Sequence, residues 1–183
     1  IVTNRITQKN CMNCHSFCQN DPNCMMFHMR ASLAGTILFK DDVIRKVNTQ
    51  TEATLSAGVY PSWHPDGNHI AFSVNTIYQK FHGNTGENIY VYDAFSNLVI
   101  YNIKTNTITT SPAVSTERLE NLPCWSPDGK SLYFCSAQIK KPMKYSEVRY
   151  DLMRIGYDIH TNEWGEPEKI LTAAETGKSI SFP

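Results

Sequence analysis

The chain has 183 residues, of which 41% are hydrophobic and 19% are charged, and its 17 Lys and Arg balance its 17 Asp and Glu. This composition predicts one folded domain and excludes a disordered tail, while the balanced charge gives no electrostatic support for a nucleic acid or an anionic membrane surface as partner. No run approaches the roughly 20 apolar residues that a membrane-spanning helix needs, so we expect no membrane span in this chain.

Residues 1–10 alternate like a polar strand, have no signal-peptide layout and do not begin with Met. We therefore expect a mature form or a fragment of a longer protein. Residues 11–30 follow and contain four cysteines, two histidines and four methionines. These soft donors bind haem iron or zinc, or pair in disulfides, so this segment is the first candidate site.

Two later stretches share one template, YPSWHPDGNHIAFS at 60–73 and LPCWSPDGKSLYFCS at 122–136. In each, a short strand ends at a tryptophan, Trp63 or Trp125, and a Pro-Asp-Gly turn leads into a second alternating strand. Proline presets one turn position and glycine supplies the positive φ that the exit needs. The sequence therefore predicts two β-hairpins related by duplication.

Paired β-rich runs around polar turns fill the remaining intervals, at 35–48, 96–111 and 152–171. Turn chemistry accounts for the dipeptide Asp41-Asp42 better than catalysis does. Two polar stretches, 75–88 and 138–148, are predicted as loops between second and third strands. Residues 178–183, KSISFP, read like the start of another copy. Four strands per period of ~40 to 60 residues predict an all-β fold of propeller blades.

The copies at 63–72 and 125–134 carry a resemblance to the TolB-like (WD-repeat-like) β-propellers, whose blades have the signature W-S-P-D-G-K-x-I-A-F. The resemblance implies about three four-stranded blades of an incomplete propeller, residues 1–59, 60–121 and 122–183, with the remaining blades missing from this chain. It also implies an exported bacterial protein, periplasmic or associated with the outer membrane, that binds other proteins.

On this template, residues 16–30 become the first blade's hairpin, with Phe17 in the place of the tryptophans and Phe27 in the place of Phe72. His15 then lies at the entry to the first strand and His28 at the exit of the second. Because antiparallel pairing brings this entry and this exit to one end, we expect His15, His28 and Met29 to be neighbours.

Cys11-Met12-Asn13-Cys14-His15 matches the c-type haem attachment motif, in which two thiols bond the porphyrin and the histidine becomes an axial ligand. We therefore expect haem c held by Cys11 and Cys14, with His15 as proximal ligand and His28 as the favoured distal ligand.

Other distal ligands stay open, because directly paired strands lie ~5 Å apart, too close to sandwich a porphyrin. The alternatives are Met29, Met25, Met26, His64 and His82.

Two further alternatives remain for the cysteines. Cys11, Cys14, Cys18 and Cys24 could form a closed zinc site, or Cys18 and Cys24 could form a small disulfide across the hairpin turn. Cys124 and Cys135 do not fall opposite one another in their hairpin, so we expect them to be buried apolar residues.

No nucleophile elbow, phosphate-binding loop or zinc-protease motif is present, and we expect no enzyme. The leading interpretation is a haem-bearing TolB-like propeller for electron transfer or redox sensing in the bacterial envelope, with a redox or protein partner. The alternative is a non-enzymatic scaffold that binds a protein or glycan, in which a disulfide or zinc only staples the cysteine cluster.

Overall fold

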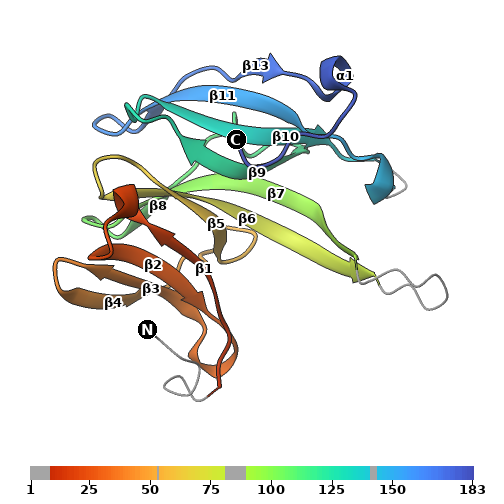
Figure 1. Cartoon of the computed structure of the whole chain (residues 1–183). Coiled ribbons are helices and arrows are strands. Elements are labelled where there is room, and N and C mark those ends of the chain that lie inside the picture. Colours follow the sequence, from red (N-terminus) through yellow and green to blue (C-terminus); the bar gives the residue numbers. More distant parts are fainter. Residues whose placement is uncertain (1–8, 53, 81–89, 141–143) are drawn as a thin grey trace.

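The computed structural model describes residues 9–52, 54–80, 90–140 and 144–183 (Figure 1). Strands dominate these residues, and the only α-helix among them is the short α1 (Ala173–Thr176). The prediction of an all-β fold is confirmed. In the described part of the chain no helix is long and apolar enough to span a membrane.

Four strands near the N-terminus form one antiparallel sheet in which each strand pairs with the next, and we call it the first unit. Its strands are β1 (Met12–Phe17), β2 (Cys24–Met29), β3 (Gly35–Lys40) and β4 (Val43–Val47). Short 3-10 turns follow β1 at Cys18–Asn20 and β2 at Ala31–Leu33. Asp41 and Asp42 form the β3–β4 turn with φ values of 51° and 59°, as expected for a tight hairpin.

The remaining strands form two further antiparallel meanders, the second and third units. The second unit contains β5 (Gly58–Trp63), β6 (His69–Lys80), β7 (Tyr90–Asn102) and β8 (Thr107–Thr109). The third contains β9 (Arg118–Trp125), β10 (Ser131–Gln138), β11 (Asp151–Asp158), β12 (Glu163–Trp164) and β13 (Glu168–Leu171), with a 3-10 turn at Tyr145–Glu147. A single parallel bridge, Ser96 to Leu119, joins these two units into one sheet.

The first strand of each unit carries the same β-bulge. The strand ends at an aromatic residue, and its register shifts within the four residues before that aromatic. Three residues before it lies a non-glycine residue with positive φ: Cys14 (52°), Tyr60 (50°) and Leu122 (55°). Such conformations are uncommon and bulges of this kind are specific features of a fold, so their repetition relates the three units residue by residue. The predicted alignment of the first hairpin with the other two agrees with this register.

The end of the chain repeats this backbone once more. Phe182 has φ 53° and precedes Pro183, just as Tyr60 precedes Pro61. The backbone N–H of Ile180 donates to the carbonyl of Tyr150 at 3.0 Å, so this segment lies alongside the third unit. The predicted likeness of KSISFP to the start of a unit therefore extends to its backbone.

The units stack face to face, as the successive layers in Figure 1 show. Trp63, Ile70 and Phe72 of the second unit pack on Met26 and Leu38 of the first.

The next interface repeats the pattern. Trp125, Leu132 and Phe134 of the third unit pack with Leu98 and Ile100 of the second. The second unit is therefore buried on both faces, and its two neighbours supply its hydrophobic environment.

One predicted loop is largely strand. Residues 75–88 were expected as a polar insertion, but β6 continues to Lys80 and pairs with β7 as far as Tyr90. Cross-strand pairs of large side chains such as Tyr78 with Tyr92 stabilise this extension, an effect that polar composition does not reveal. The rest of this stretch, residues 81–88, lies outside the described residues.

Replacing Phe72 with Ala should lower the free energy of unfolding by roughly 3 to 5 kcal/mol, because Phe72 is fully buried between two units and truncation leaves a cavity. Phe95→Ala is the matched control, since Phe95 is 52% exposed on the partner strand. Urea denaturation of both variants measures the difference. Equal losses would contradict the stacked arrangement.

Candidate functional site

The CMNCH segment occupies the edge of the first unit. Cys11 is exposed, Cys14 is half-buried at the bulge of β1, and His15 is exposed with its ring against Phe17 at a centroid distance of 6.1 Å. The Cys11 carbonyl accepts a hydrogen bond of 3.0 Å from the backbone N–H of Arg30. All six cysteines are free thiols. The motif is therefore accessible, and its thiols and imidazole are not sequestered by the fold.

His28 lies on the opposite face of the first unit, toward the second unit. It is 7% exposed, its Nδ1 lies 2.9 Å from Thr36 Oγ1, and its ring centroid is 6.0 Å from that of Phe72. Its Nε2 is buried with no hydrogen-bond partner in the described part of the chain. Burial, with the nearby Arg30 charge, lowers the pKa of His28 to about 4. The imidazole is therefore neutral at physiological pH.

The predicted neighbours are thus divided between two faces. His15 shares the outward face with Phe17, whose cross-strand partner is Met25. Met29 is half-buried and alternates along β2 to the same face as Met25, whereas Met26 and His28 alternate to the inner face. The expectation that His15 and His28 meet is corrected: the bulge between Asn13 and Ser16 shifts the register, and a one-residue slip moves a side chain to the other face.

Two of the cysteines meet at the turn of the first hairpin. Cys18 and Cys24 are buried and hydrogen-bond to one another through their thiols. Burial raises the pKa of both thiols, that of Cys24 to about 11, where the neighbouring Cys18 adds to the effect. The proposed disulfide pair is thus brought together as free thiols, and the bond itself stays a prediction.

The alternative zinc site is not assembled. Among the described residues, a group of three or more His, Cys, Asp or Glu side chains with converging ligand atoms occurs once, and it contains no cysteine. Cys11 and Cys14 lie at the β1 entry, while Cys18 and Cys24 lie at the turn. Four thiolates from these places do not converge on one ion.

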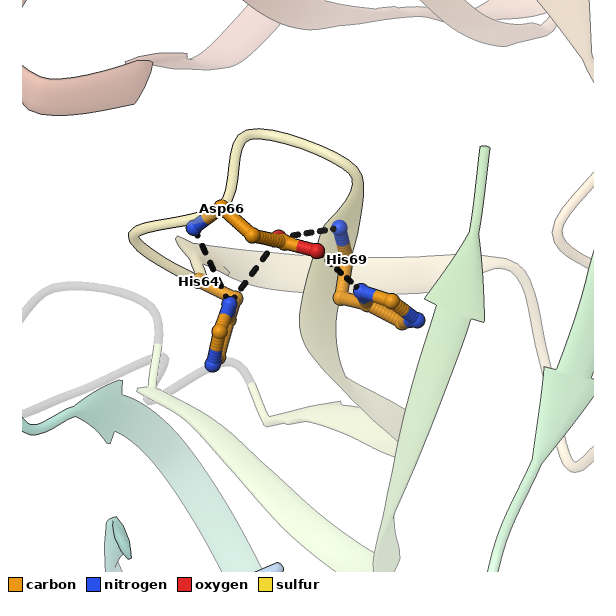
Figure 2. A group of neighbouring side chains, drawn as sticks. All are labelled: His64, Asp66 and His69. Carbon is orange, nitrogen blue, oxygen red and sulfur yellow. Dashed lines mark hydrogen bonds and ion pairs between the residues drawn. The ribbon is translucent and has the colours of Figure 1, made fainter. Parts of the chain in front are cut away.

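The converging group is His64, Asp66 and His69 at the Pro-Asp-Gly turn of the second unit, which we call the clasp (Figure 2). His64 Nδ1 lies 2.9 Å from Asp66 Oδ1, and His69 Nδ1 lies 2.8 Å from Asp66 Oδ2. Asp66 Oδ1 also accepts from the backbone N–H of Asn68 at 2.9 Å. Both histidines are buried, while the Asp66 side chain is 23% exposed.

The hydrogen bonds around the clasp determine its tautomers. The Gly129 carbonyl, 3.0 Å from His64 Nε2, can only accept, so that nitrogen carries a proton. The Asn102 amide donates to His69 Nε2 at 2.9 Å, because its oxygen already accepts two backbone N–H groups. His69 Nδ1 therefore carries the proton that it donates to Asp66. With all four ring nitrogens engaged, the clasp is a hydrogen-bonded turn and lacks the free lone pairs that a metal centre needs.

The charge of Asp66 is part of this arrangement. Burial opposes the carboxylate, but the hydrogen bonds from His69 and from the Asn68 backbone N–H hold the pKa of Asp66 well below its usual range, while His64 Nδ1 accepts from the Asp66 backbone N–H at 3.1 Å. In the other units the positions of the two histidines are occupied by Cys18 and Cys24, and by Ser126 and Ser131. Each turn is thus closed by a matched pair of side chains.

Sequence reasoning considered His64 only as an alternative distal ligand and did not relate it to His69. The signal that could have found them is their symmetrical position around the turn, one residue after the tryptophan and one before the next strand's first apolar residue. His82, another candidate ligand, lies outside the described residues. Cys135 is fully buried and Cys124 half-buried, and they pair with Asn121 and Tyr133, so they are not cross-strand partners, as expected.

Neither a protein-family model nor a curated protein matches this chain. The resemblance to TolB-like propellers therefore depends on the two Pro-Asp-Gly hairpins themselves.

The protein should lose stability below about pH 6.5, because the unfolded chain binds a proton at His28 that the folded chain does not accept until about pH 4. The penalty is absent above about pH 6.5, where His28 is neutral in both states, and it grows to about 3 kcal/mol as the pH falls to about 4. Urea denaturation at pH 7.5 and pH 5 should show a smaller pH dependence for His28→Gln than for the unmodified protein. His160→Gln, at an exposed position, is the control and should leave the pH dependence unchanged.

Asp66→Ala should cost about 2 kcal/mol of stability, since it leaves the buried donors of His69 and the turn backbone without an acceptor. Asp128→Ala removes the equivalent carboxylate from an exposed turn and should cost clearly less. Thermal unfolding of both variants at neutral pH gives the comparison. A larger loss for Asp128→Ala would contradict the role assigned to the clasp.

Proposed function

We propose that this chain is part of a TolB-like propeller that carries one covalent haem at Cys11-Met12-Asn13-Cys14-His15 and acts in electron transfer or redox sensing in the bacterial envelope. The observation that carries the proposal is the state of His15. Its imidazole is exposed and makes no hydrogen bond within the described part of the chain, and Cys11 of the same motif is an exposed free thiol. A histidine with both ring nitrogens free is available as an axial ligand.

The chemical character of the residues around the motif suits a haem. Both thiols needed for thioether bonds are free, and the outward face beside His15 presents half-buried Met25, Phe27 and Met29. A porphyrin is a large apolar group, and methionine sulfur is an accepted axial ligand of c-type haems. The apolar and thioether character of this face therefore suits the group that the motif implies.

The placement changes the preferred distal ligand. His28 is enclosed against Phe72 on the inner face, so we assign it a packing role. Met29 shares the outward face with His15 and replaces His28 as our proposed distal ligand, with Met25 as the alternative.

The bound haem would supply one-electron redox chemistry. Cys11 and Cys14 would fix the group to the edge of the first unit, and the Phe17 ring, packed on His15, restricts the rotation of the imidazole. Because Cys11 and His15 are exposed, a group held there would be accessible to a redox partner.

Three observations support reading the units as blades. The first two units are four-stranded antiparallel meanders, and in the third the fourth position beside β11 is shared by β12 and β13. Each unit starts with the same bulge, and the first strands of adjacent units contact one another. This part of the proposal also supports the second candidate function, a non-enzymatic scaffold that binds protein. The specific observation in its favour is that large apolar side chains of the first unit, Phe17 at 42% and Ile44 at 72%, are exposed among the described residues.

Export of the protein in a host that attaches haem c should yield a reduced α band that survives acid-acetone extraction. Cys11→Ala with Cys14→Ala should abolish this band. Met29→Ala should shift the reduced spectrum toward a five-coordinate form, whereas His28→Ala should leave the spectrum unchanged.

If the exported protein contains no haem that resists acid-acetone extraction, the haem proposal is wrong and the scaffold function remains. If His28→Ala alone changes the spectrum, the assignment of Met29 is wrong although the haem is present.

A further inference from the structure

A pocket lined by charged side chains lies at one end of the third unit, and we call it the basic pocket. β9 begins there at Arg118, β10 ends there at Gln138 and β11 begins there at Asp151, and antiparallel pairing aligns these strand ends. Lys169 reaches the pocket from β13, which pairs with β11. The pocket has a volume of about 330 Å³, at the lower end of the roughly 300–1,000 Å³ that ligand sites have.

Positive charge predominates in this pocket, although the chain as a whole has a formal net charge of zero. Four cationic side chains and two carboxylates line it, so the lining carries a formal net charge of +2. Like charges gathered around one recess repel one another, and an anion that enters the recess relieves this repulsion. The charged residues of the lining are Arg118, Lys140, Arg149, Lys169, Glu147 and Asp151.

The two carboxylates leave most N–H donors of the pocket unused. Glu147 Oε1 lies 3.1 Å from Lys144 Nζ, which belongs to a cation outside the pocket lining. Asp151 Oδ2 lies 3.8 Å from Arg118 Nη2 and also 3.8 Å from Lys169 Nζ, and both distances are too long for a hydrogen bond. Asp151 is therefore near two cations without accepting their protons.

Both arginines are held by bonds that use only part of their guanidinium groups. Arg118 Nε donates to Ser136 Oγ at 2.9 Å, and Arg149 Nη1 donates to the carbonyls of Ser146 at 2.7 Å and Val148 at 2.9 Å. Within the described part of the chain, the two terminal nitrogens of Arg118 make no hydrogen bond. Guanidinium groups with unused N–H donors match the oxygens of a phosphate group, which accept hydrogen bonds from several directions.

We propose that the basic pocket binds a small phosphate-bearing anion, with Arg118 and Lys169 as its principal contacts. One phosphate group carries about −1.5 to −2 charges at neutral pH, which balances the charge of the lining, whereas a single carboxylate carries only −1. This site lies in the third unit, apart from the CMNCH segment of the first. It does not depend on the haem proposal.

Isothermal titration calorimetry with pyrophosphate tests the proposal, using the full chain made without haem at pH 7.5 and constant ionic strength. We expect saturable binding of one pyrophosphate per chain and no saturable binding of acetate. Arg118→Gln and Lys169→Gln should each raise the dissociation constant at least roughly tenfold, which corresponds to about 1.4 kcal/mol. Arg45→Gln and Lys46→Gln are the matched controls, because they remove the same charges at exposed positions of β4 and should leave the dissociation constant unchanged.

Asp151→Asn should lower the dissociation constant, because it removes a carboxylate that competes with the ligand for Arg118 and Lys169. The asparagine keeps an oxygen for the backbone N–H of Ala173, which donates to Asp151 Oδ1 at 2.9 Å. A role of Asp151 and Arg118 in folding alone would not move the affinity in opposite directions in these two variants.

Absence of saturable pyrophosphate binding would overturn the proposal, and so would acetate binding of equal affinity. Equal losses in the pocket variants and in the β4 controls would also overturn it, because they indicate attraction to the overall charge. Weaker binding by Asp151→Asn would contradict the assigned competition. Circular dichroism checks that each variant is folded; if Arg118→Gln is not, Lys169→Gln, at a side chain that is 58% exposed, provides the test.

Discussion

Face-to-face packing of apolar sheets is the interaction on which the rest of this structure depends. Each unit is too thin to bury its own side chains, so the residues that make it stable belong to its neighbours. Phe72 is buried only because the first unit lies against it, and Leu98 only because the third does. In such a stack, the apolar side chains of one unit are buried only where a neighbouring unit packs on them, so the order of the units determines which sheet faces are covered.

The parts of the fold that were predictable from sequence are those governed by local chemistry. The Pro-Asp-Gly turns, the alternating strands and the aromatic residue that ends each first strand follow from turn preferences and period-two patterning. The bulge was not predictable, because Cys14, Tyr60 and Leu122 share no side-chain property and none is glycine. The bulged strands meet between units, where the Trp125 backbone N–H donates to Ser62 Oγ at 3.0 Å, and these are contacts of tertiary structure.

The unpredicted bulge also explains why the sequence placed two residues of the candidate site wrongly. CMNCH could be recognised from its spacing, but the face to which each ligand points depended on the unseen register shift. His28 therefore looked like a partner of His15 and instead fills the space between two sheets. The clasp was missed for a different reason: His64 and His69 become related only when their turn brings both rings to one carboxylate.

The hydrogen bond from His64 to the Gly129 carbonyl crosses from the second unit to the third. A Cβ at position 129 would lie 2.3 Å from His64 Nε2, so only glycine permits this approach, and Gly129 itself has φ 72°. The proton position on His64, and with it the hydrogen bonding of Asp66, thus depends on the turn of the following unit. Successive turns are therefore energetically coupled. Loss of the third unit would loosen the turn of the second unit, at a point distant from their shared core. Adjacent units should therefore unfold together rather than independently.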